Sequence, residues 1–218
     1  MVQFSDLTGL LITVVAISLI PFVAMVATSY AKIVVVLGLL RNALGVQQVP
    51  PNMVLNGIAV LVSAYVMAPI GMQAMQTMQT MHRTPGSDTS LVVLDAFDAA
   101  KEPFRAFLKK HAHEREKRFF VRSATVVWPK DMAAKIREDD LIVLAPAFTL
   151  TEMTDAFKIG FLLYIAFIVV DLVIANVLMA MGLNQVQPTN VAIPFKLLLF
   201  VVMSGWSTLI HGLVMTYR

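Results

Sequence analysis

The sequence predicts an all-α, membrane-associated protein that carries a helical insert outside the membrane. Two observations support this fold class. Hydrophobic residues make up 58% of the 218 residues and charged residues only 14%, whereas an ordinary soluble domain has about 25% charged residues. The charges are also concentrated, because residues 83–145 hold 12 of the 17 Lys and Arg and 10 of the 14 Asp and Glu.

Composition also narrows the class of function. The net charge of +3 is small, so we expect no nucleic-acid partner. The chain has no cysteine, which rules out disulfides, cysteine-ligated zinc or iron–sulfur sites and thiol nucleophiles. The mean hydropathy of +0.75 indicates a membrane protein or a protein that buries most of its surface in an assembly.

Four segments are long and apolar enough to be transmembrane helices, which need about 20 mostly apolar residues. They span roughly residues 9–30, 53–80, 156–181 and 191–215. The chain therefore divides into an N-terminal apolar helical region, residues 1–82, a charged helical insert, residues 83–145, and a C-terminal apolar helical region, residues 146–218.

The first segment and the stretch after it predict the topology. Residues 1–8 contain Asp6 and no Lys or Arg, so the first segment lacks the basic start of a cleavable signal and is expected to be retained. The predicted loop 31–52 carries Lys32 and Arg41 and no acid, which places it in the cytoplasm by the positive-inside tendency. The insert and both termini then face the other side, which is the periplasm in a Gram-negative cell.

Proline makes these segments poor simple spans. Pro21, Pro69 and Pro194 each lack a backbone donor and are expected to kink or stop a helix. Residues 72–81 have Met at every third position, a spacing that drifts around a helix instead of forming one stripe. Such adaptable side chains suit either lipid- or core-facing filler or irregular subunit contacts.

The insert is predicted to contain helices over Ser90–Ala100 and Pro103–Arg122, where apolar residues recur at spacings of three and four. Residues 126–129, Val-Val-Trp-Pro, predict a break. His111 and His113 are two residues apart, so on a helix they point about 200° apart and do not share the face that a zinc-protease motif needs. A solvated charge run from Lys109 to Arg118 is the favoured interpretation.

Ionisable residues in the C-terminal apolar region are candidates for a charge network, because charges in a membrane are costly. Glu152, Asp155 and Lys158 are expected at the start of one helix, with Asp155 and Lys158 paired. Asp171 has no local partner, and Lys196 is its candidate counter-ion. A proton relay and a paired-aspartate protease are weaker alternatives.

Three stretches of the sequence are more specific. Residues 146–161 read Pro-Ala-Phe-Thr-Leu-Thr-Glu-Met-Thr-Asp-Ala-Phe-Lys-Ile-Gly-Phe. Residues 28–33 read Thr-Ser-Tyr-Ala-Lys-Ile, and residues 39–52 read Leu-Leu-Arg-Asn-Ala-Leu-Gly-Val-Gln-Gln-Val-Pro-Pro-Asn. Pro194-Phe195-Lys196-Leu197 is followed by Gly205-Trp206. Over essentially the whole chain, the sequence resembles the FliP/SctR (YscR/HrcR/SpaP) family of export-apparatus proteins, and injectisome members more than flagellar ones.

The resemblance implies a function. Members of the family form a ring of five copies and, with SctS and SctT, build the gate through which unfolded substrates leave the cytoplasm. It implies a multi-pass protein of the bacterial inner membrane, with much of the assembly facing the periplasm. It also implies bent helical hairpins that are largely raised out of the bilayer within the secretion base. SctU, SctV and the inner rod and needle are further expected partners.

The sequence departs from the family pattern at two places. The family usually has Asp-Gly-Trp near its C-terminus, where this chain has Ser204-Gly205-Trp206. The family often has a Met-rich run that forms a gasket around the closed pore, and the corresponding residues here are Leu183, Asn184 and Gln185. We expect these three residues to line the constriction, with an ordinary interhelical turn as the alternative. Our candidates for subunit packing are Met72, Met75, Met78 and Arg41.

Two other functions stay open on the sequence. A stand-alone membrane transporter or channel subunit should show an internal repeat and a binding site at mid-membrane, and we find no repeat between residues 9–80 and 156–215. An intramembrane enzyme is the weakest alternative. The sequence contains no phosphate-binding loop, no Gly-x-Ser-x-Gly motif and no dinucleotide fingerprint, so we expect no enzymatic activity and no cofactor.

Overall fold

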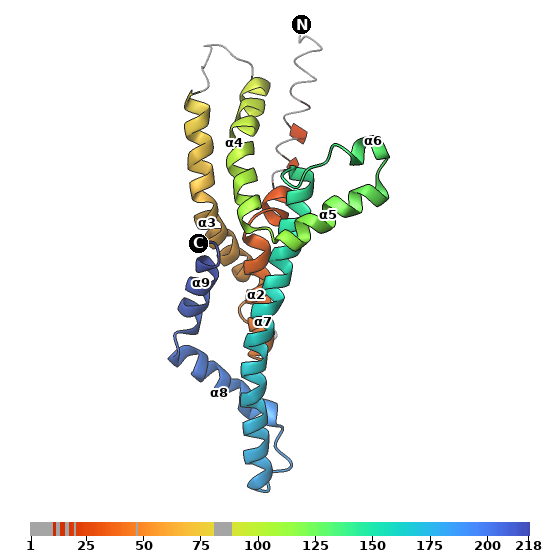
Figure 1. Ribbon diagram of the computed structural model, residues 1–218. Coiled ribbons are helices and arrows are strands. Elements are labelled where there is room, and N and C mark those ends of the chain that lie inside the picture. The colour runs from red at the N-terminus through yellow and green to blue at the C-terminus, as the bar shows by residue number, and fades with distance from the viewer. Residues whose placement is uncertain (1–10, 12–13, 16–17, 20, 47, 81–88) are drawn as a thin grey trace. The chain divides into compact units, whose positions relative to one another are not determined.

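A computed structural model describes residues 11, 14–15, 18–19, 21–46, 48–80 and 89–218. All regular secondary structure in these ranges is α-helical, which confirms the predicted all-α class. The helices are shown in Figure 1 and are α2 (Tyr30–Ala43), α3 (Asn52–Thr80), α4 (Thr89–His111), α5 (Glu114–Val127), α6 (Lys130–Ala133), α7 (Leu141–Ala180), α8 (Pro188–Val202) and α9 (Gly205–Met215).

Two of the described helices are long and apolar enough to cross a membrane. They are α3, with 29 residues, and α7, with 40 residues. Helices α8 and α9 pass the same test together as a pair bent by 62°. Three of the four predicted segments correspond to these helices. In the first predicted segment residues 21–26 are helical, and residues 9–10, 12–13, 16–17 and 20 lie outside the described residues, as do residues 83–88 of the predicted insert.

The chain forms two compact units, each assembled from segments that are distant in sequence. The first unit comprises Met1–Ala31 and Ala64–Glu152, and the second comprises Lys32–Ser63 and Met153–Arg218. The predicted boundary between the insert and the C-terminal region falls inside α7, which begins at Leu141 and continues through Pro146. The predicted division into residues 1–82, 83–145 and 146–218 is based on charge and stays a prediction of which parts of the chain lie in the membrane.

The core of the first unit joins α4 to the first turns of α7. Five residues form it and all of them are buried: Leu108, Ala112, Leu144, Ala147 and Phe148. The ring of Phe107 packs on that of Phe148, with 5.4 Å between the ring centroids. A run of large apolar side chains at helical spacing on both helices therefore produces this core.

The helices of the insert begin and end at other residues than the sequence predicts. Helix α4 runs without interruption through Pro103, which was expected to start a new helix. The chain breaks instead at His113, whose backbone N–H donates to the hydroxyl of Thr151 at 3.0 Å. Helix α5 then ends at Val127, as the Val-Val-Trp-Pro sequence predicts. The position of the break follows from tertiary packing, because Leu108 and Ala112 are buried in the core just before it. The surrounding sequence is rich in charged residues and does not predict this burial.

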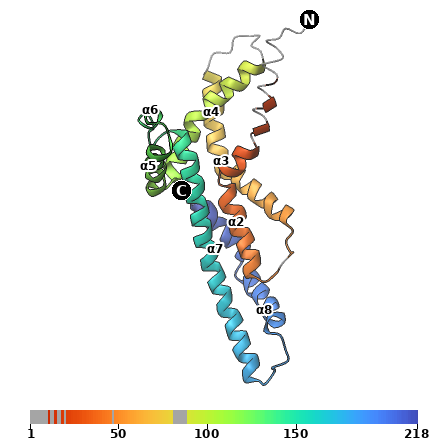
Figure 2. The ribbon, with the colours of Figure 1, turned by 90° about the vertical axis from the view of Figure 1, so that its right-hand side faces the viewer.

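The core of the second unit joins α2, α7 and α8. It contains Leu40, Ala43, Leu44, Phe167 and Phe200. After the end of α7 the chain turns back, and α8 lies beside the C-terminal part of α7 (Figure 2). Close packing of α2 on α7 requires a glycine, because a Cβ atom at Gly160 would lie 2.2 Å from Cδ1 of Leu39.

Helix α2 corrects the prediction of a loop over residues 31–52. Its inward face repeats at i, i+3, i+4 and i+7, which is the spacing of one side of a helix. The residues at these positions are fully buried: Ile33, Val36, Leu37 and Leu40. The charges of Lys32 and Arg41 suggested a loop, but both residues have partners within the second unit.

Proline does not stop the apolar helices, and the kink that was expected as the other outcome stays a prediction. Pro69 lies inside α3 and Pro194 lies inside α8. Each removes one backbone hydrogen bond, which a long helix tolerates when its other bonds and contacts are intact. The break in the last segment is at Met203–Ser204 instead, where Ser204 has φ 50° and ψ 42°. This left-handed conformation turns the chain between α8 and α9.

Candidate functional site

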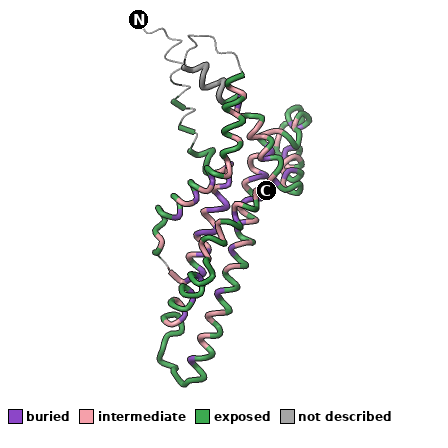
Figure 3. Tube along the Cα trace, turned by 90° about the vertical axis from the view of Figure 1, so that its left-hand side faces the viewer, coloured by how far each residue is buried: buried purple, intermediate pink, exposed green. Residues whose placement is uncertain are grey.

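Many apolar residues in the C-terminal half of α7 are exposed, and Figure 3 colours most of this stretch as exposed or intermediate, with few buried positions. Only 11% of the most apolar stretch of α7 is buried, and 17% of that of α3. Exposed residues include Phe161, Leu162 and Leu172. Contiguous apolar surface of this kind marks contact with a membrane or with other proteins, so most of the apolar surface of α7 is available for such contacts.

Lys196 and Asp171 form an ion pair between α8 and α7, as the sequence suggested. The Nζ atom of Lys196 lies 2.6 Å from Oδ2 of Asp171 and donates a second hydrogen bond to the carbonyl of Ala43 at 3.1 Å. Ala43 is the last residue of α2, so its carbonyl lacks a helical donor, and a cation there also complements the helix dipole. The lysine is buried, while the Asp171 side chain is 43% exposed.

Asp155 and Lys158 also pair, with 2.9 Å between Oδ1 and Nζ. They do not lie at a helix start, because α7 begins at Leu141, so the expected dipole stabilisation is wrong. The exposed position of Lys158 makes this an ordinary surface pair, which contributes little stability. Glu152 is buried and belongs to the first unit. The role of these residues in assembly stays a prediction.

Lys32 is a buried cation, whereas its sequence context indicated only a role in topology. Its Nζ atom lies 3.4 Å from the hydroxyl of Thr216 and 4.3 Å from the centroid of the Tyr217 ring. A cation over an aromatic face is stabilised by the ring quadrupole. Lys32, Val36 and Leu40 lie four residues apart on one helix face, so the burial of this lysine was predictable once α2 was recognised.

The segment between α7 and α8 carries the three predicted constriction residues. Gly182 has φ 75°, and the chain closes α7 with two hydrogen bonds, from Gly182 N–H to Met179 O and from Leu183 N–H to Leu178 O, each 3.0 Å. This is the glycine-ended Schellman arrangement. Leu183 is 44% exposed, and Asn184 and Gln185 are also exposed. Among the described residues neither amide side chain forms a hydrogen bond.

The predicted packing residues lie in different surroundings. Arg41 closes the connection between α2 and α3, because its Nη1 donates to Oδ1 of Asn52 at 2.6 Å and to the carbonyl of Pro50 at 3.3 Å. Met72 and Met75 are exposed on α3, and Met78 is half-buried. The last methionine of the run, Met81, lies outside the described residues.

The bend between α8 and α9 forms a half-open apolar pocket of about 450 Å³ against α7. Phe167, Phe200, Leu209 and Gly212 are among its lining residues. The ring of Phe200 meets that of Trp206 edge-on at 5.4 Å between centroids. A Cβ atom at Gly205 would lie 2.2 Å from the Phe200 ring, so only glycine fits beside this aromatic pair.

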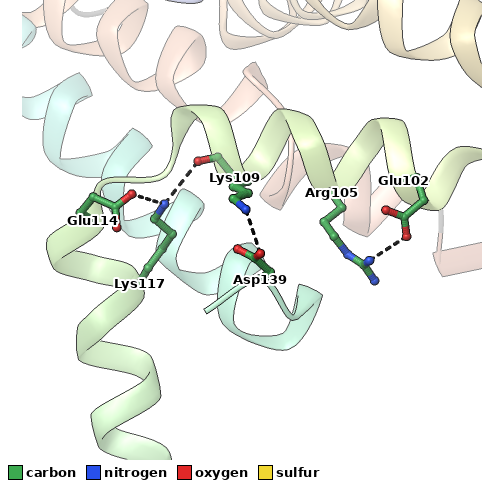
Figure 4. A network of polar contacts seen from close by, with 6 residues as sticks. All are labelled: Glu102, Arg105, Lys109, Glu114, Lys117 and Asp139. Carbon is green, nitrogen blue, oxygen red and sulfur yellow. Dashed lines mark hydrogen bonds and ion pairs between the residues drawn. The ribbon is translucent and has the colours of Figure 1, made fainter. Parts of the chain in front are cut away.

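The insert holds a network of ion pairs, shown in Figure 4. Lys117 is buried and lies 2.6 Å from Glu114, and Lys109 lies 2.8 Å from Asp139. Hydrogen bonds from Lys117 and Lys109 lower the pKa of Glu114 and that of Asp139, respectively, below the usual carboxyl values. The run from Lys109 to Arg118 is therefore partly folded into the unit, which corrects its prediction as a purely solvated stretch.

Comparison with known proteins decides the family. The model of the FliP family matches residues 11–213. The chain belongs to the FliP family. Over 216 residues it is 67% identical to the hypersensitivity response secretion protein HrcR of Ralstonia nicotianae, a match that covers 99% of this chain and 100% of that relative.

Two other relatives lie further from this FliP-family chain. Yop proteins translocation protein R of Yersinia pestis is 46% identical over 221 residues, which cover 100% of this chain and 99% of the relative. Virulence protein YscR of Salmonella typhimurium is 38% identical over 200 residues, or 92% of each chain. The resemblance predicted from residues 28–52, 146–161 and 194–206 is thereby confirmed. As a FliP-family member with apolar spanning-length helices, the chain is membrane-associated.

Proposed function

We propose that this chain is a structural pore subunit of a type III protein secretion export gate, and that with SctS and SctT it forms the channel for unfolded substrates. Membership of the FliP family supports this proposal, and so do relatives named for secretion and translocation. The role is structural, and its chemistry is that of ion pairs and apolar contacts between subunits.

The observation that carries the proposal is the uncovered apolar surface of α7. Lipid alone is a poor cover for it, because the carboxylate of Asp171, although paired with Lys196, is 43% exposed on this helix and a charge that faces hydrocarbon is costly. Neighbouring protein can cover apolar side chains and at the same time supply further polar partners to the exposed part of Asp171. An assembled ring therefore accounts for a helix that is both strongly apolar and charged.

A ring of five copies gives the loop after α7 a defined role. The loop between Gly182 and Pro188 contains no charged residue, as suits a segment that meets its own symmetry copies, because like charges around a ring repel. In this arrangement Leu183 closes the channel by dewetting, and Asn184 and Gln185 form hydrogen bonds between copies. The exposed Met72 and Met75, with Met78 and Arg41, are the proposed packing residues of neighbouring subunits.

The proposed location is the bacterial inner membrane, with the insert on the periplasmic side. Lys32 and Arg41, which lie on α2, support a cytoplasmic position for the segment 31–52 by the positive-inside tendency. The remaining proposed partners are SctU, SctV, the inner rod and needle, and the periplasmic base, with unfolded proteins in transit. No nucleic-acid partner is proposed.

The test is co-expression with SctS and SctT, followed by native mass measurement of the detergent-extracted protein. We expect one large complex that contains five copies of this chain. Deletion of the chain should also abolish type III secretion and prevent assembly of the gate. A monodisperse protein that stays monomeric beside its partners would contradict the proposal.

A further inference from the structure

Helix α5 uses only one of its sides to pack on its own unit. Lys117 and Ala124 are buried on that side, and Phe120 packs against the core of the first unit. The opposite side lines an open groove of about 650 Å³. Its residues recur at spacings of three and four, and they are Arg115, Arg118, Phe119, Arg122, Ser123, Val126 and Val127.

Acidic neighbours offset only part of the positive charge of the groove. Arg115 lies 3.7 Å from Glu116, and the charge of Arg118 helps to lower the pKa of Glu114. Arg118 and Arg122 are four residues apart, a spacing at which like charges disfavour a helix. Neither guanidinium forms an ion pair or hydrogen bond with the described residues. Two other basic side chains of the same unit are paired with acids: Lys109 with Asp139 and Lys117 with Glu114 (Figure 4). Arg118 and Arg122 therefore repel each other with no carboxylate of the described residues within ion-pair distance.

Apolar side chains lie among these arginines. Phe119 is 54% exposed and Val126 is 85% exposed. A helix that lies on a membrane surface separates its apolar and basic residues onto different faces. In α5 they are mixed along one open side of the helix, and the other side already packs on the core. Arginine next to an exposed aromatic residue is instead typical of protein–protein contacts.

We propose that this groove binds an acidic segment of another protein, in which carboxylates flank an apolar side chain. The carboxylates pair with the planar guanidinium groups of Arg118 and Arg122, which present parallel N–H donors to a carboxylate. The apolar side chain lies against Phe119 and Val126. The inference rests on the proposed function only in taking this partner to be a component of the same secretion apparatus.

The first test is carbodiimide crosslinking in the assembled apparatus with the full-length variant Arg118→Lys/Arg122→Lys. The reagent activates a partner carboxylate, and a nearby amine displaces the urea to form an amide bond. The exposed Lys130 and Lys135 of the same unit serve as internal controls. We expect crosslinks from positions 118 and 122 to Asp or Glu of another protein, with a yield that falls as salt rises. Crosslinks from Lys130 and Lys135 alone would overturn the proposal.

The second test reverses charge. Arg118→Glu/Arg122→Glu and the control Lys130→Glu/Lys135→Glu change the net charge of the same unit equally. We expect the first variant to lower co-purification of the crosslinked protein at least tenfold and the control to leave it unchanged. Replacing the crosslinked acid of the partner with Lys should restore binding. Equal retention of the partner by both variants overturns the proposal. The proposal is also overturned if Arg118→Glu/Arg122→Glu keeps the protein partner and loses only binding to phosphatidylglycerol-containing vesicles.

Failure of docking and failure of the proposed function are distinguishable. If the groove variant assembles and secretes like the unmodified protein while deletion of the chain abolishes secretion, docking fails and the function stands. If deletion leaves secretion intact, the proposed function fails. Circular dichroism of the purified complexes shows whether the helical content of the variant is retained, and so separates both outcomes from misfolding of α5. If the charge reversal unfolds the insert, the milder Arg118→Gln/Arg122→Gln variant replaces it in the same binding test.

Discussion

The ammonium of Lys196 lies 2.6 Å from the carboxylate of Asp171 and 3.1 Å from the carbonyl of Ala43. Three helices, α2, α7 and α8, therefore meet at one buried cation. Because the lysine is buried while Asp171 is half-exposed, loss of one partner does not have the same effect as loss of the other.

Asp171→Asn is expected to destabilise the protein more than Lys196→Met. The first change leaves a buried ammonium without its carboxylate, at a cost of about 2–3 kcal/mol, whereas the second leaves a carboxylate that water or a partner can solvate. The double variant should be more stable than Asp171→Asn alone. Thermal unfolding midpoints of the detergent-extracted complex measure this, and equal effects of the two single changes contradict it.

Gly160→Ala is expected to destabilise the second unit by about 1–3 kcal/mol, because overpacking displaces neighbouring groups. A Cβ atom there would lie 2.2 Å from Cδ1 and 2.9 Å from Cβ of Leu39, so α2 must move. Gly38→Ala is the matched control, since a Cβ atom at Gly38 meets nothing within 4 Å. Urea titrations that give the two variants the same unfolding midpoint would refute the close-packing argument.

Acid is expected to weaken the ion pairs of the insert. The pKa of Glu114 and that of Asp139 are lowered in the folded state by Lys117 and Lys109. A lowered pKa contributes stability above the unfolded-state value, about 4, and this stability is lost as the pH falls through the folded-state pKa. Hydrogen exchange of α5 measured from pH 6 down to pH 3 should therefore show decreasing protection relative to the intrinsic rate.

The control for that pH dependence is Asp139→Asn, which removes one of the two lowered carboxyl groups. In this variant the protection of α5 should be lower at neutral pH than in the unmodified protein, and it should decrease less as the pH falls. Both carboxylates are exposed, so salt should reduce the difference as well. Protection that rises as the pH falls would mean that these pairs do not stabilise the unit.

Exchange of the charges of Asp155 and Lys158 tests whether their pairing matters for assembly. We expect Asp155→Lys/Lys158→Asp to restore more of the assembled complex than either single change, because the attraction survives in reversed order. Recovery should be partial, since an exposed pair contributes only about 0.3–0.5 kcal/mol. Single neutral variants that assemble normally yet block secretion would favour a proton relay instead.

Disulfide crosslinking tests the proposed constriction. The chain has no cysteine, so Leu183→Cys or Gln185→Cys introduces a single thiol per copy. If these residues ring the pore, oxidation should join neighbouring copies and slow export. Thr189→Cys on α8 is the control at the edge of the same loop. Crosslinking at position 189 and none at 183 or 185 would place the constriction elsewhere.

Several features of this protein were readable from local sequence. Hydropathy identified α3, α7 and the α8–α9 segment, because runs of apolar residues of this length have few other stable states. Spacing predicted the Asp155–Lys158 pair, and the charge-free runs made Lys196 the candidate partner of Asp171. Residues 28–33, 39–52, 146–161 and 194–206 also indicated the family, which the match to the FliP family confirmed.

Long-range packing decided the remaining features. Helix α2 forms where charges suggested a loop, since its face from Ile33 to Leu40 is buried within the second unit. Pro103 and Pro194 do not end their helices, whereas Ser204 does turn the chain, because the contacts around a residue outweigh a single missing hydrogen bond. The burial of Lys32 beside Tyr217 depends on residues 185 positions apart, and local propensity carries no information about a contact at that separation.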